Sequence, residues 1–192
     1  MVELVPTIEE IKYFKYFRDL REESLITLQP IIKKFRVKYG EQPVRIGQVS
    51  HYLFFVLKGA IRQFYYNEGK DVTEYFAFEG DGFFSVESYL RQVPATVGAV
   101  ALESSELLAI PRDKLMDLTH EHASVGVFYD SCLDESLVIS QHRVYSLQFE
   151  TAKQRYDKLL ATRPYIIQRV PSIYIASYLG VSPETLSRIK HK

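Results

Sequence analysis

Glycine is unevenly spread along this chain of 192 residues, and its distribution separates two kinds of structure. Seven of the nine glycines lie between residues 40 and 98, where they separate short runs rich in β-branched and aromatic side chains. Strand-sized runs with a turn residue about every ten positions are typical of antiparallel sandwiches and barrels. The runs are Tyr52–Leu57, Ala60–Tyr66, Val72–Phe78, Thr96–Leu102 and Glu106–Ile110. We therefore expect an α+β chain in which residues 1–112 form an antiparallel, jelly-roll-like β-roll with flanking helices.

Three local patterns in this part of the chain give more specific expectations. Asn67–Lys70 joins two of the runs and contains Gly69, which can supply the positive φ of a tight hairpin turn. Tyr52–Leu57 is apolar throughout, as is typical of a strand buried on both faces. Thr7 is a good N-cap, so we expect a helix over Ile8–Phe17.

After Pro111 glycine becomes rare and the apolar residues take up helical spacing, so residues 113–150 are predicted to form linking helices. Steps of four and three residues place one set of side chains along a single side of a helix, as in a seam between paired helices. The set is Leu133, Leu137, Ser140, Val144 and Leu147. The alternative is that this stripe packs on the chain's own β-domain. We favour a dimer seam, because a long helix between two domains has little else to cover it.

Charge is also unevenly distributed along the chain. The formal net charge is zero, yet residues 151–192 carry +6 and residues 1–150 carry −6. A basic segment of this kind indicates a partner that is a polyanion, although a solvated basic helix face would also account for it. Overall neutrality therefore does not argue against nucleic acid as a partner.

The segment from Ser172 to His191 has the pattern of two short helices joined by a tight turn, and residues 151–192 are predicted as a DNA-binding domain. Gly180 can end the first helix in the left-handed conformation. Ser182 is a good N-cap for the second helix, and Pro183 follows at the first helical position, where its missing N–H costs nothing. This pattern is typical of a helix-turn-helix.

One face of the second helix carries side chains that suit a DNA groove. Glu184, Ser187 and Arg188 lie away from the apolar side of the helix. Arg188 has the geometry to bind both acceptors of a guanine edge, and Glu184 can accept from a cytosine amino group. We expect Lys190 and Lys192 near phosphates, which position a protein without reading sequence. A plain helical hairpin with a solvated polar side is the alternative.

The motifs of common catalytic and metal sites are missing from the sequence. It has no phosphate loop, dinucleotide-binding glycine motif or nucleophile elbow. His120 and His122 lack the spacing of a helical zinc pair, and no base can be assigned to the single cysteine, Cys132. We therefore predict no catalytic residue, no metal site and no identified cofactor, and we do not expect an enzyme.

No stretch of the sequence approaches the 18 consecutive apolar residues that indicate a membrane-spanning helix. The first residues, Met1–Pro6, lack the basic start and apolar run of a signal peptide. We expect a cytoplasmic protein with no membrane partner.

A β-roll, a pairing helix and a helix-turn-helix, in this order and at this size, resemble the Crp/Fnr transcription regulators. The most specific parts of the resemblance are Tyr174–Ile189 and the glycine-rich roll from Tyr52 to Asp81. The resemblance implies a homodimer on double-stranded DNA, controlled by an effector or partner that reorients the helix-turn-helix. RNA polymerase is a candidate further partner.

The family's recognition helix often has the pattern S-R-E-T-x-x-R, and this chain matches it at Ser182, Glu184, Thr185 and Arg188. The match implies base reading by Glu184 and Arg188 and phosphate contact by Ser182 and Thr185. Pro183 replaces the first arginine, so that base contact is not expected. Many members continue into a β-hairpin wing. The printed chain ends at Lys192, so weaker backbone contacts are expected.

The resemblance is weaker in the sensory half of the chain. Members that bind cyclic AMP use a G-E pair and, about ten residues later, an R-S or R-T pair. Counted from Gly80-Asp81, these positions hold Phe84-Ser85 and Ala95-Thr96, so the glutamate and the arginine are both missing. Glu87 would add a second anion near a phosphate. We expect an effector pocket at Phe84, Ser85, Glu87, Ala95 and Thr96 that does not bind cyclic AMP in the usual way.

Two other functions remain open from the sequence. The first is an effector-binding or protein-interaction module with a vestigial helix-turn-helix, against which the retained Glu184 and Arg188 argue. The second is a β-roll enzyme, which bound metal in the purified protein would support.

Overall fold

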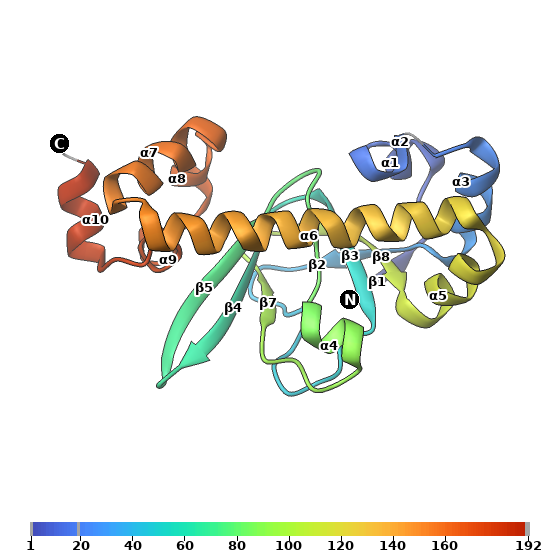
Figure 1. Ribbon diagram of the computed structural model, residues 1–192, viewed down its shortest axis with the longest axis horizontal. Coiled ribbons are helices and arrows are strands. Elements are labelled where there is room, and N and C mark those ends of the chain that lie inside the picture. Colours follow the sequence, from blue (N-terminus) through green and yellow to red (C-terminus); the bar gives the residue numbers. More distant parts are fainter. Residues whose placement is uncertain (1, 19, 191–192) are drawn as a thin grey trace.

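The computed structural model describes residues 2–18 and 20–190, without the side chains of residues 2 and 3. It contains a β-roll, a long helix lying along the roll, and a helical unit at one end of the molecule (Figure 1). The strands are β1 Val2–Leu4, β2 Lys33–Val37, β3 Tyr52–Lys58, β4 Ile61–Asn67, β5 Lys70–Ala77, β6 Gly82–Phe83, β7 Gly98–Ala101 and β8 Ser105–Pro111. The helices are α1 Ile8–Lys12, α2 Lys15–Arg18, α3 Glu22–Leu28, a 3₁₀ turn at Gln29–Ile31, α4 Val86–Arg91, α5 Arg112–Glu121, α6 Ala123–Phe149, α7 Ala152–Thr162, α8 Ile166–Arg169, α9 Ser172–Leu179 and α10 Pro183–Lys190.

Two antiparallel sheets form the roll, one in the order β1-β2-β8-β3-β6 and the other in the order β5-β4-β7. Each of the five strand-sized runs in the sequence contains a strand, so the predicted roll is confirmed. Strand β3 shows why one of those runs is entirely apolar. Leu53 and Phe55 pack into a cluster under the N-terminal helices and α6, whereas Phe54 and Val56 pack between the sheets. The strand is buried on both faces, as expected.

The hairpin between β4 and β5 is also confirmed. Asn67 pairs with Lys70, and the two residues between them have positive φ, +50° at Glu68 and +76° at Gly69. Positive φ at both central positions matches the right-handed twist of the flanking strands. Gly69 adopts this conformation without the steric cost that a side chain would add.

The predicted continuous helix over Ile8–Phe17 is wrong. Thr7 does form a capping box with Glu10, but α1 ends at Lys12 and α2 begins at Lys15. The amide of Phe14 donates to Ile11 and that of Phe17 donates to Phe14, so the backbone repeats every three residues here. This tighter repeat places Ile11, Phe14 and Phe17 on one side, where all three are fully buried.

Strand β2 was not foreseen, because its sequence holds three basic residues. Lys34 is nonetheless buried, and its ammonium lies 2.6 Å from Glu10 and 2.9 Å from Glu106. The two carboxylates come from α1 and β8, and they compensate the charge that the strand carries into the fold.

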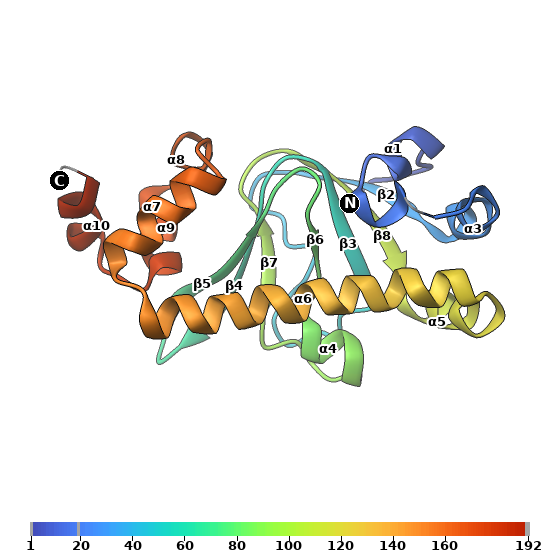
Figure 2. The ribbon, with the colours of Figure 1, turned by 45° about the horizontal axis from the view of Figure 1, so that its top comes forward.

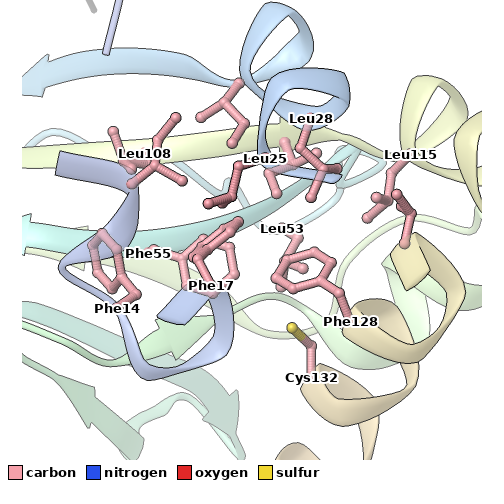
Figure 3. Packing of buried hydrophobic residues seen from close by; sticks show 14 of the residues in the cluster. Phe14, Phe17, Leu25, Leu28, Leu53, Phe55, Leu108, Leu115, Phe128 and Cys132 are labelled. Carbon is pink, nitrogen blue, oxygen red and sulfur yellow. The ribbon is translucent and has the colours of Figure 1, made fainter. Parts of the chain in front are cut away.

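The long helix α6 packs on the roll through its N-terminal half (Figure 3). The ring of Phe128 lies 4.7 Å from that of Phe17 and 6.3 Å from that of Phe55. Cys132, one turn later, is buried in the same cluster. Farther along, α6 runs past β4 and β5 toward the C-terminal helices (Figure 2). Among the described helices, none is long and apolar enough to cross a membrane.

Phe17→Ala should lower the free energy of unfolding by about 3–5 kcal/mol, because it leaves a cavity among three other aromatic rings. Denaturant unfolding of the purified chain measures the change. Ile26→Ala, on the exposed side of α3, is the matched control and should change stability by no more than about 0.5 kcal/mol. Equal effects of the two substitutions would contradict the packing described for α2.

Candidate nucleic-acid interface and effector cavity

Helices α9 and α10 are joined by the turn that the sequence predicts. Gly180 ends α9 with φ of +66°, and its amide donates to the carbonyls of Ala176 and Ser177. The hydroxyl of Ser182 accepts from the amide of Thr185 at 3.2 Å and caps α10. The N-cap satisfies one of the free amides at the start of the helix.

A small apolar core holds these two helices together with α7 and α8. From these helices its buried members are Tyr156, Leu159, Ile166, Val170, Ile175, Ala176, Leu179 and Leu186. The roll contributes Ala60, Phe76, Phe78 and Leu102 to the same cluster. Val181 and Ile189 are partly buried against it. We call residues 151–190 the C-terminal unit.

The opposite side of α10 is exposed. Glu184, Ser187, Arg188 and Lys190 all lie on the surface, while Leu186 is buried. Arg188 donates to the hydroxyl of Thr185 at 3.1 Å, and the ammonium of Lys190 donates to Ser172 at 3.0 Å.

The other residues predicted to contact DNA are Ser182, Pro183, Thr185 and Lys192. Ser182 and Pro183 are exposed, and Thr185 is partly exposed. A hydrogen bond from Ser182 lowers the pKa of Glu184, so its carboxylate is ionised at neutral pH. Lys192 lies outside the described residues. An acidic and a basic side chain thus lie side by side on one exposed helix, which suits binding to polar base edges.

The stripe predicted on α6 is mostly uncovered. Leu137, Val144 and Leu147 have 60%, 50% and 44% of their surface exposed, whereas Leu133 packs against the roll core. Ser140 is exposed, and its hydroxyl bonds to the carbonyl of Ser136 within the same helix. The stripe is therefore largely exposed along the C-terminal half of α6, where Ser140 and Val144 also line a cavity.

A cavity of about 870 Å³ lies between the roll, α6 and the C-terminal unit. Phe84, Ser85, Glu87 and Thr96 line it, four of the five residues proposed for an effector pocket. Ala95 is different, because its side chain is 3% exposed and packs in the core between the sheets. The backbone of Ala95 bonds to residues 47 and 48, and this pairing turns its methyl group inward.

Helix α6 and the C-terminal unit contribute a second wall of the cavity that the sequence alone did not reveal. Cys132, Ile139 and Arg143 come from α6, and Arg163 and Tyr178 come from the C-terminal unit. These residues are far in sequence from the roll residues opposite them, and no local pattern marks them as lining. The pKa of Cys132 is raised to about 12 by burial, so its thiol stays protonated. Within residues 2–18 and 20–190, no group of three or more potential ligand side chains is placed to hold a metal ion.

Ion pairs join the C-terminal unit to the roll. Arg169 binds Glu79 through two hydrogen bonds of 2.8 Å and reaches Glu103 at 2.5 Å. Arg163 donates to Asp81 at 2.6 Å. Two parallel bonds between a guanidinium and a carboxylate are stronger and more directional than a single contact.

A buried arginine adds to this interface from the roll side. Arg62 on β4 is 2% exposed, pairs with Asp71 and donates to the hydroxyl of Thr73 at 2.8 Å. Its guanidinium lies 4.0 Å from the ring centre of Tyr174 on α9. The amide of Thr73 donates to Ser177 at 2.8 Å, so α9 covers part of the free edge of β5.

Burial alone would raise the pKa of Glu79, but the hydrogen bonds from Arg169 and from the amide of Gly59 lower it below the usual 4.5. The hydrogen bonds that Arg169 donates to Glu79 in turn raise the pKa of Arg169. A carboxylate with a lowered pKa stabilises the fold above its unfolded pKa, and that contribution is lost as the pH falls through the folded value.

Known proteins share this architecture. Residues 34–122 match the sequence model of the cyclic nucleotide-binding domain. FixK2 from Bradyrhizobium japonicum is 19% identical, with a TM-score of 0.71 and coverage of 84% of this chain and 83% of that one. The catabolite activator protein of Thermus thermophilus is 24% identical, with a TM-score of 0.58 and coverage of 92% and 84%. No curated protein is significantly similar in sequence.

A third structure, a putative transcriptional regulator of the Crp/Fnr family from Eubacterium rectale, is 18% identical. Its TM-score is 0.71, and the match covers 94% of this chain and 86% of that one. At these identities the similarity establishes the fold. The predicted α+β architecture is therefore confirmed, and the resemblance to the Crp/Fnr regulators is confirmed for the fold.

Glu79→Gln should lower the free energy of unfolding by about 1–3 kcal/mol at pH 7, because it removes the charge that Arg169 binds. The difference from the unmodified chain should shrink as the pH falls from the ordinary value of 4.5 to the lower pKa that Glu79 has in the folded chain. Denaturant unfolding at a series of pH values measures it.

Glu87→Gln is the matched control, since Glu87 pairs with Arg91 and both side chains are more than half exposed. An exposed pair contributes about 0–1 kcal/mol, so this variant should stay close to the unmodified chain. A loss for Glu79→Gln that is independent of pH would contradict the ion-pair explanation.

Proposed function

We propose that this chain, which has the fold of the Crp/Fnr regulators, is a homodimeric DNA-binding transcription regulator. The observation that carries the proposal is the exposed face of α10, where Glu184, Ser187 and Arg188 stand outward while Leu186 anchors the helix. The proposed domains are a sensory β-roll over residues 1–112, linking and dimerisation helices over 113–150, and a DNA-binding helix-turn-helix over 151–192. No catalytic role is part of the proposal.

In the proposed complex α10 enters the major groove and reads base edges through Glu184 and Arg188. Ser182 and Thr185, at the N-terminal end of the helix, are assigned to phosphate contacts, as are Lys190 and Lys192. The free amides at the start of α10 and its dipole favour a phosphate there. The Arg188–Thr185 hydrogen bond is between exposed groups, so Arg188 can exchange it for a base at little cost.

The dimer is assigned to the uncovered stripe of α6. Leu137 and Val144 are seven residues apart, and Leu147 follows after one more turn. A second copy of the same stripe would bury these side chains and place two recognition helices on one duplex. Such a regulator acts in the cytoplasm, with RNA polymerase as the proposed partner.

The cavity is assigned to a small-molecule effector other than cyclic AMP. Phe84-Ser85 and Ala95-Thr96 stand where members that bind cyclic AMP have the ribose-binding glutamate and the phosphate-binding arginine. Arg91 lines the cavity, but Glu87 holds its guanidinium at 3.3 Å. A phosphate bound at these positions would lack the family's arginine and lose a strong charge-assisted interaction.

Arg188→Ala should reduce binding to a preferred DNA sequence by roughly 5- to 150-fold, equivalent to about 1–3 kcal/mol, and should relax discrimination at one base pair. Lys190→Ala is the comparison variant, because loss of a phosphate contact weakens all sequences about equally and lowers the salt dependence. Anisotropy titrations on DNA selected from random sequence measure both. No preferred sequence at low salt, or unchanged discrimination by Arg188→Ala, would favour the interaction module with a vestigial helix-turn-helix.

Val144→Glu should convert the dimer to a monomer, because it would bury two carboxylates against each other in the seam. Val138→Glu introduces the same charge at another exposed position of α6, about 120° around the helix, and should leave the dimer intact. Sedimentation at micromolar concentration distinguishes the two. A monomeric unmodified chain would rule out the seam.

A further inference from the structure

Two charged side chains that line the cavity have no ion pair within the described part of the chain. They are Glu74 on β5 and Arg143 on α6, and both line the cavity. Most other charges lining it are paired, in the pairs Lys15–Glu135, Asp81–Arg163, Glu87–Arg91 and Lys158–Glu150. Arg155, also on the lining, is held by the carbonyls of residues 150 and 179. The uncompensated charges thus occur at one place, between β5 and α6.

The guanidinium of Arg143 is placed to accept an anion. Among the described residues it has no ion pair, and it packs over the ring of Tyr178 on α9, whose centre lies 4.1 Å from Cζ. Partial burial, together with the neighbouring Arg155, lowers the pKa of Arg143. A partly buried guanidinium with no acceptor for its N–H donors has lost water without gaining a counter-charge.

The carboxylate of Glu74 also lines the cavity, although the residue is exposed. The surrounding protein raises its pKa, and the attraction of Arg143 opposes this shift without forming an ion pair. Each charge affects the pKa of the other group, yet the two side chains form no ion pair. A cationic ligand would leave Arg143 without a counter-charge, and an anionic ligand would be repelled by Glu74.

We propose that this end of the cavity binds a small zwitterion of the α-amino-acid type, with its carboxylate on Arg143 and its ammonium on Glu74. Ile139 lies one helical turn before Arg143 and lines the same cavity with Tyr75 and Tyr178. These side chains favour a ligand whose body is apolar or aromatic. A cavity of about 870 Å³ is within the usual range for small-molecule sites, about 300–1,000 Å³.

The site touches all three parts of the molecule at once, and this part of the inference rests on the proposed function. Arg143 belongs to α6 and Glu74 to the roll, while Tyr178 belongs to α9, next to the Ser177 that binds the edge of β5. A carboxylate that draws the guanidinium toward it changes the contact between Arg143 and Tyr178. Ligand occupancy thereby biases how the C-terminal unit packs on the roll.

Isothermal titration of the full chain without DNA tests the site with three matched probes. L-phenylalanine carries both charged groups, 3-phenylpropanoate lacks the ammonium, and 2-phenylethylamine lacks the carboxylate. L-phenylalanine should bind at least about tenfold more tightly than either of the others, since each lost charge-assisted contact costs about 1.4 kcal/mol or more.

Substitutions assign each charged group of the ligand to its residue. Arg143→Gln should remove the advantage of L-phenylalanine over 2-phenylethylamine, and Glu74→Gln should remove its advantage over 3-phenylpropanoate. Arg143→Lys keeps the charge and should bind more weakly than the unmodified chain but more tightly than Arg143→Gln. Lys158→Gln is the matched control, since Lys158 lines the cavity but is paired with Glu150, and it should leave affinity unchanged. Thermal unfolding confirms that each variant is folded.

Three outcomes would overturn the proposal. They are no binding of any probe, binding that Arg143→Gln leaves unchanged, and cyclic AMP binding more tightly than all three probes. Because the titration contains no DNA, a failure of DNA recognition would leave the ligand result standing. DNA binding without ligand binding would overturn this inference alone.

Discussion

The packing of Phe128 against Phe17 and Phe55 holds the helix α6 on the β-roll, with ring centres 4.7 Å and 6.3 Å apart. Because α6 continues without a break for 27 residues, fixing its first half on the roll also sets the course of its second half. That course leaves Leu137 and Val144 uncovered and turns Arg143 toward the cavity. One aromatic cluster therefore positions both the stripe proposed for pairing and a wall of the cavity.

The C-terminal unit is held to the roll by apolar packing and by arginine contacts together. Phe76 and Phe78 of the roll share one buried cluster with Ile166 of the unit. Arg169 and Arg163 donate to roll carboxylates, and the buried Arg62 packs against Tyr174. The contacts between partly exposed charges in this interface respond to pH and salt.

Sequence reasoning succeeded where a few neighbouring residues decide the conformation. The hairpin at Asn67–Lys70, the cap at Thr7 and the left-handed Gly180 were all predictable from local preferences. It failed where distant residues decide. The basic sequence of β2 is a strand only because Glu10 and Glu106 neutralise Lys34, and the helix expected over Ile8–Phe17 is interrupted because three apolar side chains must enter one cluster.

The sequence by itself determined the order of the parts, the exposed polar face of α10 and the concentration of positive charge after residue 150. Only the tertiary structure decided which charges are paired, since Arg169 meets Glu79 and Arg143 faces Glu74 across long separations in the chain. The physical reason is one of range. Backbone preferences act over a few residues, whereas burial and ion pairing depend on how the whole chain is folded.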